Sequence, residues 1–437
     1  MKNRQILLIC DNRDTRNWGS RGTSIALGQI LGFRGEIAST PREMAIKRHP
    51  VGPLRSYISN GRHGQTVSHL IRKTRTFHAL YRLFGGRDDY VMMDPARTLA
   101  LFQREVKRGN SRLAELLEQF NRADNVVVNG GGSLIFSRPP RRELKFQLFA
   151  MELAASLGKP VSYVNATAGG SPESASDGQL ETFVMNTLRK CDTIALRDPV
   201  SRDRLQALGF DNATWYPDAL FTWRTRYASL LDSDVLSNTP ELLETWPESD
   251  QVYHSRKSWT GPYICVSSDA CPPEVLPESW SAFYEKLIGE LMPRSGMQVI
   301  VVDPEGNDFL LPLCRRRDIP YVASKANLFA GASLLAGARA YVGGRYHPAI
   351  MASLGGAPCT ILGSNAHMAE GLQHVLDYDD PAVFPVEQSK ENIRAIVDDV
   401  IVKLEGGDLL RRRLINQAHT NSYKVRYGLC STLSHSV

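Results

Sequence analysis

The chain has 437 residues, of which 42% are hydrophobic and 22% are charged. These proportions are those of a soluble globular protein, and the sequence holds no apolar run of the roughly 18–20 residues that span a bilayer. The length is too great for one ordinary core and predicts two domains. The net charge of +6 is uneven, because residues 1–120 carry 21 Lys and Arg against 10 Asp and Glu.

The cysteines and the first residues of the chain indicate the cellular compartment in which the protein is expected. The seven cysteines are odd in number, scattered and without a C-x-x-C pair, so we expect a reduced cytoplasmic protein without structural zinc. The first residues have a basic head but a five-residue apolar core, which is short for a secretory signal and fits a buried strand.

Residues 40–87 form a basic segment. They contain ten Lys and Arg, four His and one acidic residue. Such a segment can face an anionic substrate, acidic lipid headgroups or nucleic acid, or be a solvated surface insertion. No nucleic-acid-binding motif is present, so we expect no nucleic-acid partner. The histidines lack the spacing of metal ligands, and no metal site is predicted.

Strand and helix signals alternate through the first half of the chain, which predicts a parallel sheet. A polar loop over 11–22 is expected to precede a helix over 23–31, and a glycine turn over 130–133 is expected to end the strand at 125–129. The predicted strands are 5–10, 35–39, 125–129, 161–165, 193–196 and 213–216. The other predicted helices are 66–84, 96–121 (broken near 109–110), 142–157, 179–190 and 199–209.

The second half repeats this alternation, so a second doubly wound domain is predicted. Its expected strands are 263–267, 298–302, 321–322, 340–343 and 359–362. Its expected helices are 279–291, 328–337, 349–354, 366–375, 390–404 and 407–418. The predicted division is an N-terminal α/β domain at 1–225 with a basic insertion at about 40–95, a linker or insertion at 226–260, a C-terminal α/β domain at 261–390, and C-terminal helices at 391–437.

The stretch 340–358 is the most informative. A short apolar strand ends at two glycines, and Arg345 and His347 follow where a helix begins. This pattern places both side chains at the carboxyl edge of a sheet, beside helix N–H groups that favour anions. Arg345 would supply a fixed charge and His347 would carry a proton. A structural role, in which Arg345 pairs with a surface carboxylate and His347 caps the helix, is the alternative.

Further candidates follow other strands. Arg197 stands directly between a strand and a helix, so we expect it to bind the same anion. Gly131 and Gly132 would let backbone N–H groups approach an anion or another ligand, and Ser133 would add a donor. A plain turn explains the glycines equally well.

Asp198 and Asp218 are candidate general bases, because each follows a strand. Each also stands where it can cap a helix, and this is the favoured interpretation for Asp198. Asn17 and Gly19 are expected to shape the floor of the cleft from the first strand, or to form a simple turn.

Four segments form a pattern together: 17–23 (NWGSRGT), 129–134 (NGGGSL), 197–201 (RDPVS) and 344–349 (GRYHPA). In this order and at these separations they resemble the polysaccharide pyruvyl transferase family. The resemblance covers the framework of both predicted domains and leaves out 40–95 and 228–260. It implies a glycosyltransferase-B-like fold of two Rossmann-like, doubly wound domains that face a cleft. It also implies transfer of the enolpyruvyl group of phosphoenolpyruvate to two sugar hydroxyls, as a cyclic ketal.

With the residue patterns above, the resemblance implies a catalytic group of His347, Arg345 and Asp218. It implies a donor-binding set of Arg197, Arg345, Asn17, Gly131, Gly132, Ser133, Ser364 and His367. Many relatives carry Lys or Arg near the position of His367, and a neutral imidazole there is a weaker partner for an anion.

We therefore predict a pyruvyl transferase that uses phosphoenolpyruvate and no cofactor. Its acceptor would be a sugar of a polysaccharide or of a lipid-linked precursor, at the cytoplasmic face of the membrane, where the basic segment would contact acidic lipids. One alternative is a nucleotide-sugar glycosyltransferase of the same fold, although no acidic residue is obviously placed to hold a ribose. The other is a non-catalytic glycan-binding homologue, which we would expect to lack Arg345 or His347.

Overall fold

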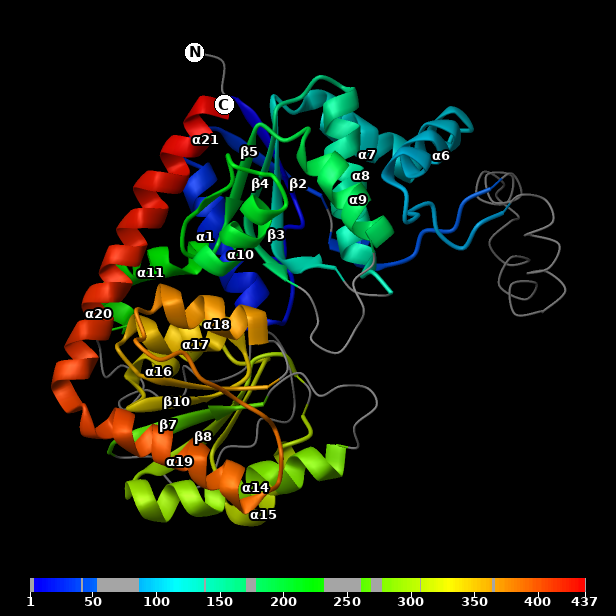
Figure 1. The fold of residues 1–437 in the computed structure, drawn as a ribbon. Coiled ribbons are helices and arrows are strands. Elements are labelled where there is room, and N and C mark those ends of the chain that lie inside the picture. Colours follow the sequence, from blue (N-terminus) through cyan, green and yellow to red (C-terminus); the bar gives the residue numbers. More distant parts are fainter. Residues whose placement is uncertain are drawn as a thin grey trace, which may run out of the picture.

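The computed structural model describes residues 4–40, 42–52, 86–136, 139–169, 178–231, 261–268, 277–306, 308–363 and 366–436. The chain forms two six-stranded sheets in which all strands run parallel, one above the other in Figure 1. Two Rossmann-like domains therefore face each other, as the sequence predicts.

The first sheet has the strand order β2-β1-β3-β4-β5-β6. Its strands are β1 (Gln5–Ile9), β2 (Glu36–Ser39), β3 (Asn125–Ile135), β4 (Val161–Gly169), β5 (Thr193–Leu196) and β6 (Thr214–Trp215). The helices of this half are α1 (Trp18–Leu31), α2 (Arg42–Ile46), α6 (Pro95–Lys107), α7 (Ser111–Arg122), α8 (Arg142–Ser156), α9 (Gly178–Leu188), α10 (Pro199–Ala207), η1 (Ala219–Thr222), α11 (Trp223–Arg226) and α12 (Ala228–Leu231).

The second sheet has the order β12-β11-β10-β7-β8-β9. Its strands are β7 (Tyr263–Ser267), β8 (Gln298–Asp303), β9 (Tyr321–Ala323), β10 (Ala340–Gly343), β11 (Cys359–Leu362) and β12 (Val383–Phe384). The helices are α14 (Pro277–Ser295), α15 (Leu311–Arg317), α16 (Leu328–Gly337), α17 (Tyr346–Leu354), α18 (Ala366–Val375), α19 (Lys390–Glu405), α20 (Gly407–Tyr423), the π-helical η3 (Lys424–Leu429) and α21 (Cys430–Ser436).

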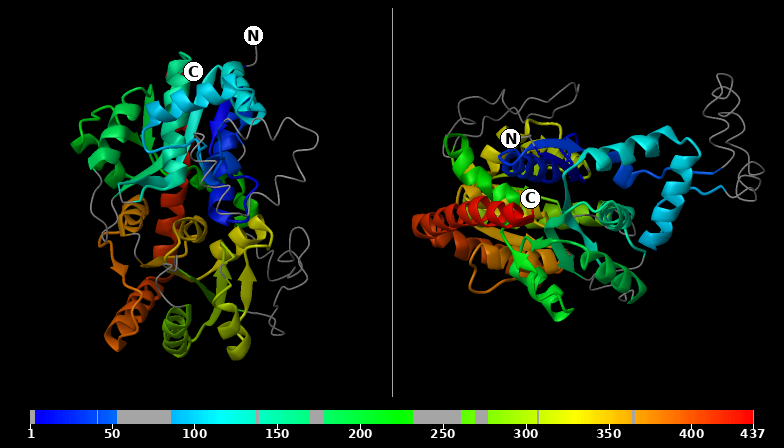
Figure 2. Two further views of the ribbon diagram at one scale, coloured as in Figure 1. Left: turned by 90° about the vertical axis from the view of Figure 1, so that its right-hand side faces the viewer. Right: turned by 90° about the horizontal axis from the view of Figure 1, so that it is seen from above.

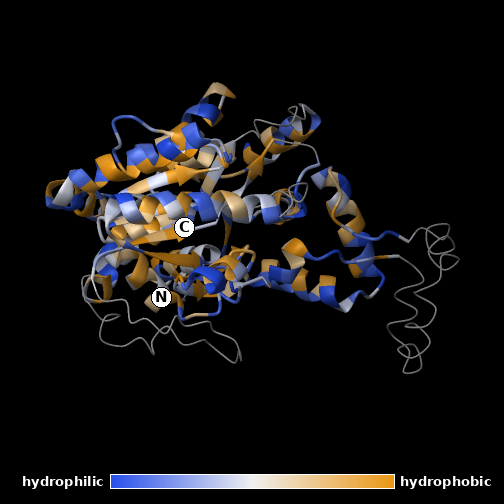
Figure 3. Cartoon of the chain, turned by 90° about the horizontal axis from the view of Figure 1, so that it is seen from below, coloured by the Kyte–Doolittle hydropathy of each residue, from blue (hydrophilic) through white to orange (hydrophobic). Residues whose placement is uncertain are grey.

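Helices cover both faces of each sheet, which explains the continuous apolar runs of the strands. In β1, Ile6 and Leu8 join one apolar cluster, whereas Leu7 and Ile9 join the cluster on the opposite face. The strands are correspondingly hydrophobic in Figure 3. The cluster that contains Ile6 also includes Met351 of α17, so one core continues from the first domain into the second.

Helix α1 begins at Trp18, five residues before the predicted start, so the prediction of a loop over 11–22 is wrong for its last part. The Asn17 side chain caps the helix by accepting a hydrogen bond from Ser20 N at 2.9 Å. Gly19 and Gly22 lower the intrinsic helix propensity and so conceal this turn in the sequence. Trp18 anchors it instead, because its indole N–H donates to the Ser324 carbonyl at 2.9 Å in the second domain.

The predicted glycine turn at 130–133 is also wrong, because β3 continues to Ile135. The strand absorbs a bulge between Gly131, whose φ is +52°, and Leu134, and then pairs again with β4. Strand β4 has a matching bulge next to Asn165, whose φ is +56°, and extends to Gly169 instead of ending at 165.

The C-terminal helices cross back to the first domain. Helix α20 continues beyond the predicted end at 418, through η3 and into α21, and runs along one side of both domains (Figures 1 and 2). Thr432 shares a hydrogen bond of 2.6 Å with Tyr216, and the Cys430 carbonyl accepts one of 3.0 Å from Arg34. These contacts outweigh the poor helix propensity of the residues that follow 418.

Several predictions fall outside the described residues. These are the helix at 66–84 and most of the basic segment, and the part of the predicted linker at 232–260. The described ends of the basic segment meet at an isolated antiparallel bridge between Val51 and Arg87. None of the described helices combines the length and apolarity needed to cross a membrane.

Candidate active site

A cavity of about 250 Å³ opens between the carboxyl edges of the two sheets. It gathers residues from α1, β3 and β5 of the first domain and from the loops after β8 and β10 of the second. It thereby brings together eight residues that the sequence placed at the cleft: Asn17, Gly19, Gly131, Gly132, Ser133, Arg197, Arg345 and His347. Asp218 lies directly behind them. Ser364 lies outside the described residues, as does the side chain of His367.

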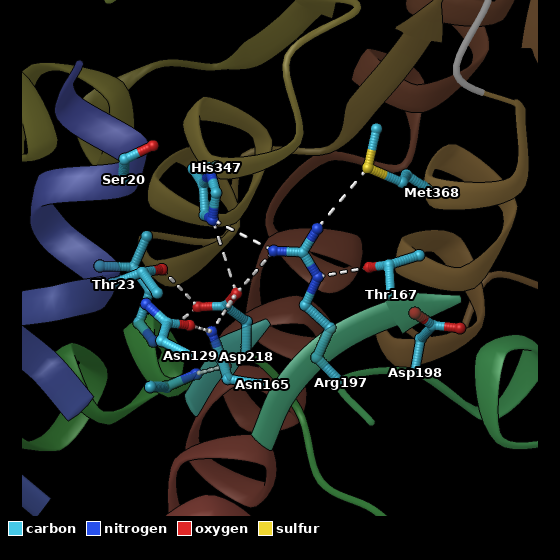
Figure 4. A network of polar contacts seen from close by, with 12 residues as sticks. Ser20, Thr23, Asn129, Asn165, Thr167, Arg197, Asp198, Asp218, His347 and Met368 are labelled. Atoms are coloured by element: carbon cyan, nitrogen blue, oxygen red, sulfur yellow. Dashed lines mark hydrogen bonds and ion pairs between the residues drawn. The ribbon is translucent and has the colours of Figure 1, made fainter. Parts of the chain in front are cut away.

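Arg197 lies at the end of β5 with 1% of its surface exposed. Its Nε donates to Thr167 Oγ1 at 2.5 Å, and its Nη1 donates to Asp218 Oδ2 at 3.1 Å. The guanidinium stacks 4.0 Å from the ring centroid of Tyr346, and Nη2 lies 3.6 Å from the sulfur of Met368. The charge is therefore held rigidly, while Nη2 meets only a weak acceptor among the described residues and remains suited to an anion (Figure 4).

Asp218 is fully buried and accepts hydrogen bonds from several donors. Oδ1 receives Thr23 Oγ1 at 2.7 Å and Leu220 N at 2.9 Å. Oδ2 faces Arg197, Asn165 and His347. Burial alone raises the pKa of Asp218, but His347, Arg197 and the Leu220 N–H together outweigh it and hold this pKa well below its ordinary value. Asp218 is therefore an ionised carboxylate behind the cavity wall.

His347 lies in the first turn of α17 and contacts both members of this ion pair. Its Nε2 is 3.3 Å from Arg197 Nη1 and 3.5 Å from Asp218 Oδ2 (Figure 4). With Nε2 unprotonated, the ring accepts a hydrogen bond from Arg197; with Nε2 protonated, it donates to Asp218. The site can therefore stabilise either state of a proton carrier whose ring lines the cavity.

Arg345 ends the loop after β10 and is 12% exposed. Its Nη1 lies 2.6 Å from Glu305 Oε2, and Glu305 Oε1 accepts a hydrogen bond of 2.8 Å from Asn17 Nδ2. Glu305 thus connects the cap of α1 with the second domain. Arg345 therefore does pair with a carboxylate, as the alternative of a purely structural role predicted, but both side chains line the cavity.

The bulge in β4 supplies a residue that the sequence analysis missed. Asn165 accepts a hydrogen bond from Ala219 N at 2.9 Å and donates to Asp218 at 3.4 Å and to Asn129 at 3.3 Å. It holds the segment that carries Asp218 against the sheet. Its positive φ is tolerated because asparagine adopts the left-handed region more readily than most residues.

The glycines of β3 allow neighbouring groups to approach the backbone closely. A Cβ atom at Gly130 would lie 2.5 Å from that of Ala166, and one at Gly132 would lie 3.2 Å from the Met368 sulfur. Gly131 has open space around its Cβ position and a positive φ. The backbone at Gly131 and Gly132 therefore lines the cavity without side chains between it and a ligand.

Asp198 has the capping role favoured from its position. It accepts hydrogen bonds from Ser201 N at 2.7 Å and from Ser201 Oγ at 2.8 Å at the start of α10. Within the described ranges, no three His, Cys, Asp or Glu side chains are grouped as ligands for a metal ion.

Other lining residues were not identified from the sequence, notably Arg141, Glu143 and Glu305. Glu305 comes three residues after the predicted strand at 298–302, behind Asp303 and Pro304, so the sequence could have placed it near a sheet edge. Arg141 and Glu143 lie at the start of α8, the helix that follows β3, and the true length of β3 was underestimated.

Solved structures with this architecture belong to GT-B proteins. Alr3699/HepE from Anabaena, solved in complex with UDP and glucose, has a TM-score of 0.53 and 11% identity, covering 99% of this chain and 100% of its own. The UDP-GlcNAc 2-epimerase of Methanocaldococcus jannaschii, solved in complex with UDP-GlcNAc and UDP, has a TM-score of 0.51 and 9% identity, covering 91% of this chain and 92% of its own. At such identities the similarity shows the fold alone.

The sequence comparisons are more specific. No curated protein sequence matches the chain significantly. A family model described as "Polysaccharide pyruvyl transferase" matches residues 48–365, which include the glycine bulge, Arg197, Arg345 and His347. The chain belongs to the polysaccharide pyruvyl transferase family.

Proposed function

We propose that the protein transfers the pyruvyl group of phosphoenolpyruvate to two hydroxyls of a sugar, forming a cyclic ketal. The observation that carries this proposal is the contact of His347 with the buried Arg197–Asp218 pair at the wall of a cavity. It joins a proton carrier to a fixed cation, which are the two groups that protonation of an anionic enol phosphate needs.

The donor carries a carboxylate and a phosphate, so its site needs cations and free N–H groups. Arg197 offers Nη2 to the cavity, Arg345 offers a second guanidinium, and the backbone at Gly131 and Gly132 adds donors. We propose that these groups bind phosphoenolpyruvate together with Ser133, Asn17, Ser364 and His367.

We propose that His347 protonates the methylene carbon C3 of the donor. One sugar hydroxyl then bonds to C2 and loses its proton to a base. The bond from C2 to the phosphate oxygen next breaks, the second hydroxyl bonds to C2, and its proton leaves with the phosphate. Asp218 does not line the cavity, so in this scheme it acts through His347, by stabilising the charged ring.

The base for the first hydroxyl is then another carboxylate. Two described carboxylates line the cavity, and Glu305 is engaged by Arg345 and Asn17. Glu143 is half-buried in the first turn of α8, and no ion pair joins it to another described residue. One turn further along, Gln147 donates to the carbonyl of Gly130 at 3.3 Å, so this face of α8 lies over the glycine bulge. We propose Glu143 as the base.

The proposed acceptor is a sugar of a polysaccharide or of its lipid-linked precursor at the cytoplasmic membrane face. Purified protein should be incubated with phosphoenolpyruvate and a panel of glycosides, and in parallel with UDP-sugars and the same panel. Phosphate release that depends on a glycoside supports the proposal. Nucleotide release from a UDP-sugar would support the glycosyltransferase alternative, and binding of glycosides without either release would support the non-catalytic one.

A further inference from the structure

A carboxylate of the protein itself already occupies the residues expected to bind the donor. Glu305 places one oxygen 2.6 Å from Arg345 Nη1 and the other 2.8 Å from Asn17 Nδ2. Arg345 and Asn17 come from different domains, and both are candidate ligands of phosphoenolpyruvate. The donor's own carboxylate has the same shape and charge as the Glu305 head group.

The loop that carries Glu305 is held firmly. Both oxygens of Asp303 accept backbone N–H groups, from Glu305 at 3.2 Å, Gly306 at 2.9 Å and Asp308 at 2.8 Å. The Pro304 carbonyl accepts a further bond of 3.0 Å from Trp18 N, at the start of α1. The backbone of Glu305 is therefore fixed at the cavity, while its side chain is 31% exposed and has room to turn toward solvent.

The charges around the cavity favour such a movement. Among the residues that the structure describes, three arginines and two glutamates line it, and the Asp218 carboxylate lies behind them. These six formal charges cancel while Glu305 remains in place. A donor with a carboxylate and a phosphate therefore enters an environment whose positive charge is already neutralised, unless one resident carboxylate leaves.

Of these carboxylates, Glu305 is the one placed to leave. Asp218 is fully buried and accepts hydrogen bonds from Thr23, Leu220, Arg197 and Asn165, and its departure would leave the buried Arg197 without a counterion. Glu143 has no contact with either arginine of the donor site among the described residues. The Glu305 side chain is partly exposed, and its carboxylate is held at the site by Arg345 and Asn17.

We propose that Glu305 is a resident carboxylate that the anionic donor displaces from Arg345 and Asn17. In the empty enzyme Glu305 connects the two domains, and on displacement the donor takes over both contacts. The residue thereby lowers the affinity for small anions in general, and it couples donor binding to the contact between α1 and the second domain. This inference rests on the proposed function in taking phosphoenolpyruvate as the donor.

The test is the dissociation constant of phosphoenolpyruvate, and separately of inorganic phosphate, measured calorimetrically for wild type and Glu305→Gln. Glutamine keeps the shape of the side chain and removes its charge. Relief of the like-charge contact should tighten phosphoenolpyruvate binding by about tenfold or more. The matched control is Glu285→Gln on α14, which removes a surface carboxylate paired with Arg316 and Arg317 and should leave both constants unchanged.

Unchanged or weaker phosphoenolpyruvate binding by Glu305→Gln would overturn the displacement, because it would mean that Glu305 supports Arg345 in the complex. A Glu305→Ala variant should also tighten binding. Tightening in both variants assigns the effect to the lost charge, and tightening in Glu305→Ala alone assigns it to an altered loop. If wild type and all variants fail to bind phosphoenolpyruvate, the proposed function falls and the displacement falls with it.

Discussion

The ring of His347 packs directly on Gly19 across the domain boundary. A Cβ atom at Gly19 would lie 2.4 Å from His347 Nδ1 and 2.6 Å from its Cβ. The second residue of α1 must therefore lack a side chain for the ring to reach Arg197 and Asp218.

Gly19→Ala should consequently displace His347 and lower turnover by about 100-fold, since a shift of about 1 Å in a catalytic group has effects of this order. The control is Gly28→Ala on the same helix, whose added Cβ would meet only Arg13 Nη1 at 3.9 Å. Turnover measured as glycoside-dependent phosphate release should be normal in the control. Equal activity of the two variants would contradict the importance of this contact.

His347→Ala should remove most turnover, by about 10²–10⁴-fold, because the donor's methylene carbon loses its general acid. Binding of phosphoenolpyruvate should weaken only modestly, since Arg197 and Arg345 remain. Steady-state phosphate release and calorimetric binding separate the two effects. Near-normal turnover would remove His347 from the mechanism.

Arg345→Lys should weaken phosphoenolpyruvate binding by about tenfold or more, because an ammonium cannot replace a planar guanidinium and a charged hydrogen bond contributes about 1.5–3 kcal/mol. The control is Arg294→Lys on α14, whose partner Asp398 lies on the surface. Wild-type affinity in Arg345→Lys would argue against a role in donor binding.

Asp218→Asn should destabilise the fold by about 3–5 kcal/mol, because it leaves the buried Arg197 without its counterion. Asp203→Asn removes an exposed carboxylate beside Arg202 and should change stability by less than about 1 kcal/mol. Denaturant unfolding at neutral pH compares the two variants. Similar stabilities would mean that the buried pair contributes little.

The stability difference between wild type and Asp218→Asn should narrow in acid. The pKa of Asp218 is lower in the folded than in the unfolded protein, so its contribution is complete above the unfolded value of about 3.9 and is lost as the pH falls below it. Unfolding measured between pH 7 and pH 3 tests this sign. A difference that widens on acidification would show that the carboxylate is not stabilised by folding.

The alternation of apolar strands and helices was sufficient to predict every strand of both sheets except the short β12, and the segments after the strands identified Arg197, Arg345 and His347. These residues are recognisable because each stands in the stretch from the end of a buried strand to the first turn of the next helix. The start of α1 was missed because Gly19 and Gly22 disfavour a helix locally, whereas contacts with the second domain stabilise it.

The remaining site residues could not be read from local patterns. Asn165 acts through a bulge in the pairing of β4 with β5, and the contacts of Glu305 with Asn17 form only when α1 meets the second domain. The burial of Asp218 was equally hidden, because a strand end predicts proximity to the cleft but not which side chains cover the carboxylate.

Because α21 packs against the first domain, part of that domain's surface is covered only when the end of the chain has been synthesised. The roughly 200 residues between α12 and α21 require about 10–40 s at about 5–20 residues per second, and throughout that interval the surface around Arg34 and Tyr216 has no cover from α21. A ribosome that stops after α19 would release a chain that contains both sheets but lacks the helices that cover this surface. In such a product the apolar residues that pack against η3 would be exposed to chaperones and proteases. Every described residue that lines the cavity would nevertheless already have been made.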